Sequence, residues 1–280
     1  MNLIVRADDF GYCEAVNHGI FKAVEQGIVT TVELMVDMPG SEEAAAKLAE
    51  WPFIGVALHC HFQGQACAPL DQIPTLVDET GHLVLRERRK ADPTYKPSFD
   101  EQFVEWCAQQ ERFLELTGKR PDYVKPIGPN AAKMKAWAKE HDVPCDYRGG
   151  YELGMRPIYP DPEWEYLDYY TTPVMITKEQ EDPHNQAFVD SIAYFTEDFA
   201  GILTCGHENV EMVMHPGWVD DTVYQGSSYT MIRVKDLIAL TSDTVKAWVR
   251  DNGVQLASAY DVLHGTTRYQ DYIRARGDVY

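Results

Sequence analysis

Apolar and polar positions along the first sixty residues switch repeatedly between a strand pattern and a helix pattern. The segments Asn2–Ala7, Ile28–Val36 and Ile54–His59 are largely apolar runs, and each predicts a buried strand. Between them, Tyr12–Gln26 and Ser41–Glu50 carry apolar residues at the three- and four-residue spacing of a helix. Strands that alternate with helices are typical of a parallel sheet with crossover helices. The chain is therefore predicted to be an α/β protein.

The rest of the chain continues this alternation less regularly. Residues 62–97 are irregular and polar, and we expect them to form a long loop that covers or shapes a site. Residues 149–172 are rich in tyrosine and proline, which suggests an insertion on the substrate side or aromatic packing onto the core. One domain over residues 1–280 fits the usual size of an α/β barrel. Further helices are predicted over Phe99–Leu116, Ala131–His141, Asn185–Thr204 and Thr241–Asp251, and further strands over Pro121–Val124, Cys145–Tyr147, Val210–Met214 and Val254–Ala257.

Composition narrows the range of partners. The chain has 25 Lys and Arg against 44 Asp and Glu, a formal net charge of -19 that repels nucleic acid and anionic membrane surfaces. No run approaches the roughly 18 apolar residues that a membrane span needs. The six cysteines form no CxxC pair, and the chain starts without a basic and then apolar leader. We expect a cytoplasmic protein that binds neither nucleic acid nor membranes. For its oligomeric state, a homodimer is one option.

Polar clusters follow three of the predicted strands. Asp8 and Asp9 follow the first, His59 and His61 the third, and His215 the strand that ends at residue 214. The carboxyl ends of parallel strands meet at one edge of a sheet, so these groups are expected to lie together. Adjacent carboxylates repel unless a cation is close, and carboxylates with imidazoles are common ligands of divalent metals. Each cluster alone also fits a helix cap or a backbone hydrogen bond.

Longer stretches of the chain carry a family resemblance. The segments ADDFGYCEAVNHGIFKAVEQGIVTTVELMV, GVALH and EMVMHPGWVDD, followed by LTSDTVKAWV, resemble the YdjC-like carbohydrate deacetylases, which include chitooligosaccharide deacetylase. The resemblance reaches about Leu263 and implies an irregular (β/α) barrel. It further implies a hydrolase that uses a divalent metal, Mg or Zn, to remove the N-acetyl group from an amino sugar or a short N-acetylated oligosaccharide. By this resemblance Asp8 is the general base, Asp9 and His59 are metal ligands, and His215 is the general acid.

The chain departs from the family at one ligand segment. Relatives carry a second metal histidine in an Asp-Ser-His-His-like segment after a basic residue and a proline. Here that ligand position falls on Ile127, and the aspartate before it is replaced by Lys125. His61, or Glu33, where relatives tend to have threonine, would then supply the third ligand.

The alternative to an altered metal site is a site without metal. The Lys125 ammonium would then lie between Asp8 and Asp9, and the chain would carry out a different reaction on a sugar-like substrate. A barrel that binds sugar without catalysis is the third interpretation. Lys125 and Arg233 are candidate substrate contacts, with Arg233 alternatively orienting His215. Trp218 is a candidate for stacking on a sugar ring.

Overall fold

The centre of the fold is strand β1 (Asn2–Phe10), which pairs with three other strands in parallel. Its partners are β2 (Thr31–Leu34), β7 (Asn209–Met214) and β8 (Gln255–Leu256). Next to β2 lies β3 (Gly55–Leu58), and next to β7 lies β6 (Tyr170–Thr171), so the order is β3-β2-β1-β7-β6. The computed structural model describes residues 1–92, 94–126, 128–145, 159–161, 166–168, 170–171, 183–198, 201–204, 206 and 208–278.

This arrangement confirms the predicted α/β class with a parallel sheet. Strands β4 (Tyr159–Asp161) and β5 (Tyr166–Asp168) form a separate antiparallel pair, and Val124 bridges Cys145 in parallel. That the sheet closes into a barrel stays a prediction, and so does the division of the chain into one single domain. None of the helices in the described ranges is long and apolar enough to cross a bilayer.

Alternate side chains of β1 lie in two different environments, one on each face of the sheet. Leu3, Val5 and Ala7 belong to the main apolar core, whereas Ile4 belongs to a smaller cluster on the other side. Because successive side chains of a strand point to opposite faces, Arg6 follows Ile4 to this second side. Arg6 is 2% exposed. One face of the central strand therefore supports apolar packing, and the other carries a buried charge.

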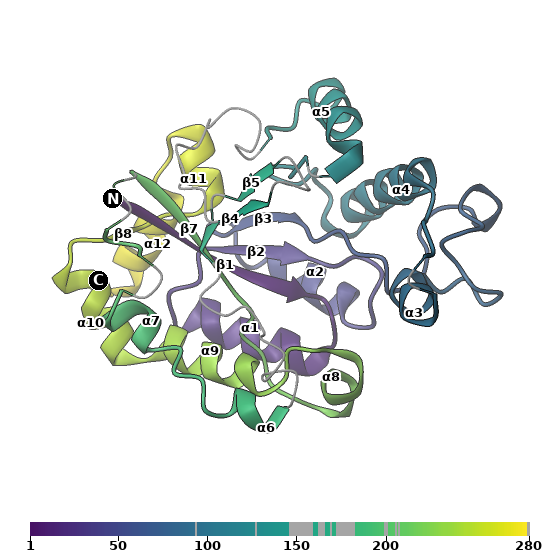
Figure 1. Ribbon diagram of the computed structural model, residues 1–280. Helices are drawn as coiled ribbons and strands as arrows, with labels where there is room; N and C mark the ends of the chain where they lie inside the picture. The colour runs from purple at the N-terminus through teal and green to yellow at the C-terminus, as the bar shows by residue number, and fades with distance from the viewer. Residues whose placement is uncertain are drawn as a thin grey trace.

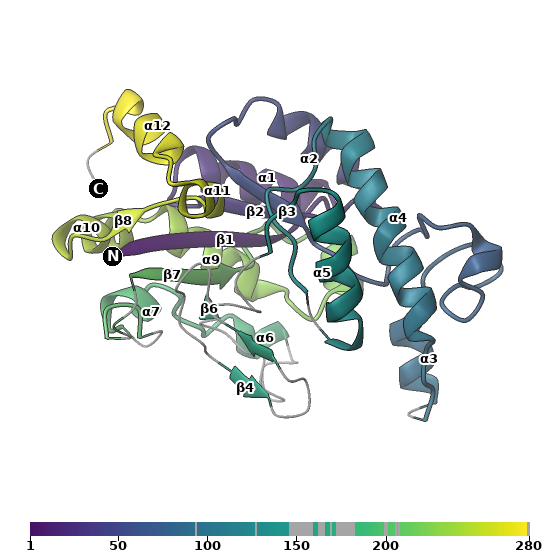
Figure 2. The ribbon, with the colours of Figure 1, turned by 90° about the horizontal axis from the view of Figure 1, so that it is seen from above.

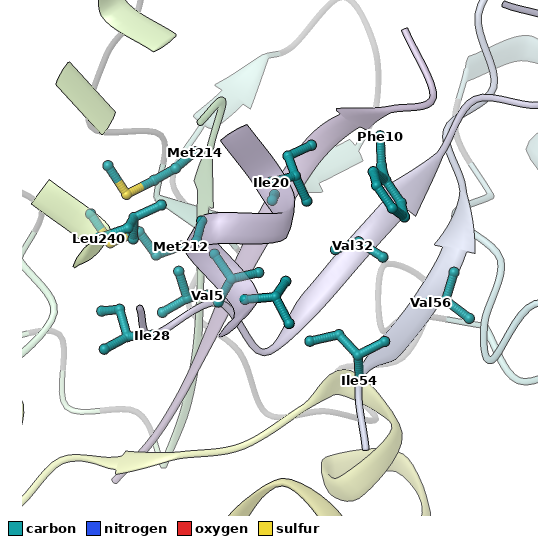
Figure 3. Packing of buried hydrophobic residues seen from close by; sticks show 14 of the residues in the cluster. Val5, Phe10, Ile20, Ile28, Val32, Ile54, Val56, Met212, Met214 and Leu240 are labelled. Carbon is teal, nitrogen blue, oxygen red and sulfur yellow. The ribbon is translucent and has the colours of Figure 1, made fainter. Parts of the chain in front are cut away.

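The main core lies between the sheet and a helical layer. Helices α1 (Glu14–Glu25) and α9 (Met231–Thr241) pack against each other beside β1, as Figures 1 and 2 show. Val5, Val32 and Met212 of the strands and Ile20 and Leu240 of the helices belong to one apolar cluster, which Figure 3 shows from close by. Burying each such side chain contributes roughly 1.5–3 kcal/mol. The predicted apolar face of the first helix is confirmed.

Other helices surround this core. Helices α3 and α4 lie beyond the arrowheads of β1 and β2 (Figures 1 and 2), where the carboxyl ends of these strands are. The remaining helices are α2 (Ser41–Leu48), α3 (Leu85–Ala91), α4 (Phe99–Thr117), α5 (Ala131–Glu140), α6 (Pro183–Gln186), α7 (Ala193–Thr196), α8 (Asp221–Gly226), α10 (Asp243–Asp251), α11 (Ala259–His264) and α12 (Arg268–Arg276).

Two predicted elements differ in detail from the structure. Residues 62–97, predicted to be a long irregular and polar loop, lie mostly outside helices and strands, but they contain helix α3 and an apolar cluster of their own. The predicted helix Asn185–Thr204 is instead two short helices, α6 and α7. At the end of α6 the Gln186 side chain accepts a hydrogen bond from Thr230 N at 2.8 Å and donates one to Ser228 O at 2.8 Å, which ties this point of the chain to the segment before α9. These partners are distant in sequence, so periodicity could not reveal them. Most of the aromatic-rich stretch 149–172 lies outside the described residues.

Helix α1 touches the loop that follows β7 through a glycine pair. A Cβ atom on Gly19 would lie 2.4 Å from the Cα of Gly217, which is closer than real side chains approach backbone. The same loop is tied to α1 by a hydrogen bond from Trp218 N to Ala15 O at 3.1 Å. This contact fixes the segment that carries His215.

We expect the substitution Gly19→Ala to destabilise the protein by about 1–3 kcal/mol, since the added methyl group forces the loop away from the helix. Urea denaturation measures the change. The control is His18→Ala on the same helix, which removes an exposed contact to Glu43 and should change the free energy of unfolding by less than about 1 kcal/mol. Equal effects of the two substitutions would contradict the close packing.

Candidate functional site

Arg6 connects three carboxylates from three segments. Its Nε lies 2.8 Å from Asp8 Oδ1, and its Nη1 lies 3.0 Å from Glu211 Oε2 and 3.2 Å from Glu33 Oε1. Burial acts to lower the pKa of Arg6, but Asp8, Glu211 and Glu33 outweigh it and hold that pKa well above its usual range. The guanidinium is therefore a permanent cation that joins β1, β2 and β7 inside the protein.

Asp9 faces different partners from Asp8 because β1 is irregular at this point. The pairing register with β2 shifts between Ala7 and Phe10, and Asp9 has a φ of 66°, in the left-handed region. Asp9 Oδ2 lies 2.6 Å from Arg233 Nη2, and Asp9 Oδ1 lies 3.2 Å from His59 Nε2. Burial acts to raise the pKa of Asp9, yet Arg233 and His59 keep it well below the usual value. Each of the two adjacent carboxylates thus pairs with a different arginine.

His59 lies between the carboxylates of β1 and β2. Its Nδ1 is 3.1 Å from Glu33 Oε2 and 4.0 Å from Asp8 Oδ2, while its Nε2 faces Asp9. Burial acts to lower the pKa of His59, but the hydrogen bonds to Asp9 and Glu33 raise it to about 10. In the absence of a metal, His59 is therefore a cation that donates from both ring nitrogens.

Glu33 is a fully buried carboxylate that already has several partners. The Tyr123 hydroxyl donates to Glu33 Oε1 at 3.1 Å, and the Lys125 ammonium contacts both carboxylate oxygens. Burial acts to raise the pKa of Glu33, yet Arg6 and Lys125 hold it well below the usual range. A carboxylate offers about four lone-pair sites, and those of Glu33 are taken up. Lys125 thus pairs with Glu33, whereas Arg6 and Arg233 are the cations on Asp8 and Asp9.

Of the two predicted replacement ligands, Glu33 lies in the cluster. Asp8, Glu33 and His59 each place one metal-binding type of atom within 4.8 Å of the others, which makes them a candidate metal triad. His61 turns instead to Asp37, with its Nε2 2.6 Å from Asp37 Oδ1. Ile127 lies outside the described residues.

His215 follows β7 and is held by Asp236. Its backbone N–H donates to Asp236 Oδ2 at 2.9 Å, and Ser191 Oγ donates to Asp236 Oδ1 at 2.7 Å. Burial raises the pKa of Asp236 to about 6. The His215 ring stacks on Tyr229, with the ring centroids 4.2 Å apart. Burial outweighs the nearby aspartates and lowers the pKa of His215, which is therefore neutral at pH 7.

Two cavities adjoin the His59–Asp9 contact. The larger, about 410 Å³, is lined by Asp8, Glu33, His59 and Lys125 together with residues of α4. The smaller, about 180 Å³, is lined by Asp9, His215 and Arg233 and by the loop that follows α8. The predicted groups are thus divided between two adjacent spaces.

Trp218, predicted to stack on a sugar, lines neither of these cavities. It is 40% exposed, and Lys22 Nζ lies 5.5 Å from its ring centroid.

The sequence analysis missed several residues that complete the site. Arg6, Glu211, Tyr123 and Asp236 hold its charged groups but were not proposed as candidates. The available signal was a charge inside an apolar strand, as in LIVRADD and NVEMVM. That signal marks a residue as unusual without giving its partner.

We expect the two site histidines to titrate on opposite sides of the ordinary histidine pKa in protein kept free of metal by a chelator. His59 should stay protonated until the pH approaches about 10, and His215 should lose its proton at a lower pH than an ordinary histidine does. Because the pKa of His59 is raised on folding, its contribution to stability is present below pH 6.5 and is lost as the pH rises through about 10. NMR of the ring carbons measures both titrations, with His59→Gln and His215→Gln giving the assignments. A His59 titration near pH 6.5 would contradict the ion-pair geometry.

Known proteins are similar to this chain over nearly its whole length, and a family model matches its first part. The family model described as YdjC-like protein matches residues 2–125. The carbohydrate deacetylase of Brevibacillus brevis is 32% identical over 271 residues, which cover 92% of this chain and 98% of the relative. The chitooligosaccharide deacetylase of Serratia marcescens is 28% identical over 277 residues, covering 93% and 98%.

A solved structure shows the same fold. It is a crystal structure from Enterococcus faecalis V583, described as that of a candidate cellobiose-phosphate cleavage protein, with a TM-score of 0.68 and 23% identity. The match covers 94% of this chain and 98% of that one. The sequence matches show that the chain belongs to the YdjC-like family of carbohydrate deacetylases.

Proposed function

We propose that the protein is a hydrolase that removes the N-acetyl group from an amino sugar or a short N-acetylated oligosaccharide. Relatives named as carbohydrate deacetylases match it over more than nine-tenths of its length. The observation that carries the proposal is the grouping of Asp8, Asp9, His59 and His215 around two adjoining cavities. A binding module has no need for a base, a cation ligand and an acid at one place.

Asp9 and His59 are the proposed ligands of a divalent cation, Mg or Zn. Asp9 Oδ1 and His59 Nε2 are 3.2 Å apart, a separation that one ion can bridge, and oxygen with imidazole nitrogen suits such ions. A divalent cation supplies Lewis acidity toward a carbonyl and lowers the pKa of water. His59 has to give up one proton before it binds a metal. The triad of Asp8, Glu33 and His59 is the second place for a cation, but Lys125 already contacts Glu33 there.

Asp8 and His215 are proposed to move the protons. Asp8 lines the larger cavity, and Arg6 fixes its carboxylate through Nε at 2.8 Å and Nη2 at 3.3 Å, so that it can accept a proton from the attacking water. His215, once protonated, gives its proton to the departing amine, and its lowered pKa makes it a stronger acid. Arg233 orients Asp9, and Asp236 orients the segment of His215.

Substitution of Asp8 by asparagine should reduce acetate release from N,N′-diacetylchitobiose at least about 100-fold, because an amide cannot accept the proton. An enzymatic assay for acetate measures the rate. Asp251→Asn, at an exposed residue that pairs with Arg250, is the control and should keep the wild-type rate. Wild-type acetate release by Asp8→Asn would overturn the role of Asp8 as base.

The Lys125–Glu33 ion pair favours a second candidate function. With an ammonium already on the buried carboxylate, the site balances its charges without a metal. The protein would then act on a sugar-like substrate through Lys125. Metal affinity separates the two candidates, because at the triad of Asp8, Glu33 and His59 a divalent cation would compete with Lys125 for Glu33.

We expect Lys125→Met to bind Mg²⁺ or Zn²⁺ about tenfold or more tightly than the wild type, since the variant frees Glu33 to join Asp8 and His59. Calorimetric titration of chelator-stripped, dialysed protein measures the affinity. Lys133→Met, which removes an exposed contact to Asp100, is the matched control and should leave it unchanged. Absence of metal binding in both wild type and Lys125→Met would instead support the metal-free candidate.

A further inference from the structure

We propose that helix α4 carries the subsite for the sugar ring of the substrate, formed by Gln102, Trp106 and Gln110. The inference rests on the proposed function and names the part of the site that recognises the substrate. It assigns to these three residues the binding of an uncharged pyranose ring through its hydroxyl groups and its apolar face.

The three side chains share one face of α4. They are spaced by four residues, which places them one above another along a helix. All three line the cavity of about 410 Å³ that also exposes Asp8 and His59. A ring bound against α4 would therefore lie beside the proposed base and cation ligand.

Two amide atoms on this face lack partners among the described residues. Gln110 is 1% exposed, and its Oε1 accepts no hydrogen bond there, while Gln102 Nε2 is buried and donates none. Leaving a buried polar group unsatisfied costs about 1–3 kcal/mol, so such groups are few in proteins and call for an explanation. Gln109 on the same helix does not line this cavity: its Nε2 donates to His61 O and Glu105 Oε1, both at 2.9 Å, while its buried Oε1 likewise accepts no hydrogen bond within the described ranges.

Trp106 lies between the two amides and is fixed in place. It is 3% exposed, stacks on Phe103 with the ring centroids 5.7 Å apart, and meets Trp137 edge to face at 5.1 Å. A fixed aromatic ring with a few polar groups beside it is the usual lining of a small-molecule pocket. Phe62 and Phe99 extend the apolar part of the same cavity.

The chemistry of this face points to hydroxyl groups. One amide atom is an acceptor and the other is a donor, and a sugar hydroxyl can serve either one. Both amides are neutral, so they supply no charge for an anionic group. The volume of about 410 Å³ falls in the range of roughly 300–1,000 Å³ typical of ligand pockets. Since these residues would recognise the ring, cellobiose, which lacks the acetamido groups, should also bind.

The test is calorimetric titration with N,N′-diacetylchitobiose and with cellobiose, in a chelator that prevents metal-dependent turnover. Gln110→Leu should raise the Kd of both sugars about tenfold, because a hydrogen bond is lost. Its thermal midpoint should stay equal or rise, since an unsatisfied buried acceptor is removed. Gln102→Leu should weaken binding in the same direction. Gln225→Leu, at an exposed amide on α8, is the control and should bind as the wild type does.

An unchanged Kd in Gln110→Leu and Gln102→Leu would overturn the subsite, and so would a wild-type protein that binds neither sugar. A lowered thermal midpoint together with an unchanged Kd would show that the substituted amide has a purely structural role, which also overturns the subsite. Acetate release separates this inference from the proposed function. Sugar binding without acetate release would overturn only the proposed function, and acetate release with a wild-type KM in Gln110→Leu would overturn only the subsite.

Discussion

The buried guanidinium of Arg6 is the interaction on which the site depends. It pairs with Asp8, Glu33 and Glu211, which come from three neighbouring strands, and all four side chains are buried. Removing one partner of such a buried set leaves an uncompensated charge, which typically costs 3–5 kcal/mol. The carboxylates of the neighbouring strands therefore come together around the Arg6 cation, and β1 can carry a polar face opposite its apolar one.

The charges around His59 balance without any ion from outside. Arg6, Lys125, Arg233 and protonated His59 are four cations, and Asp8, Asp9, Glu33 and Glu211 are four anions. A divalent cation has to displace part of this set, a proton of His59 or the ammonium of Lys125. Lys125, with Glu33 as its buried partner, therefore affects the conditions under which a metal can bind.

The proposed reacting groups and the proposed sugar contacts lie on different elements of the fold. Irregular pairing at Asp9 turns that residue toward Arg233 and the His215 side, while Asp8 stays with the larger cavity. Helix α4 closes that cavity with amides and aromatic rings that take no part in the charge network. The proposed reacting groups come from strand ends, and the proposed ring contacts come from a helix, so each set can vary without the other.

The sequence determined the α/β class, the apolar faces of β1 and α1, and the strand ends that carry Asp8, Asp9, His59 and His215. Local periodicity and the family resemblance suffice for these, because they depend on neighbours along the chain. The sequence could not show that Arg6 binds three carboxylates, that Lys125 pairs with Glu33 while His61 turns to Asp37, or that Gln186 ties the end of α6 to the segment before α9. Those outcomes depend on residues tens to hundreds of positions apart, and only the tertiary structure decides which buried charge finds which partner.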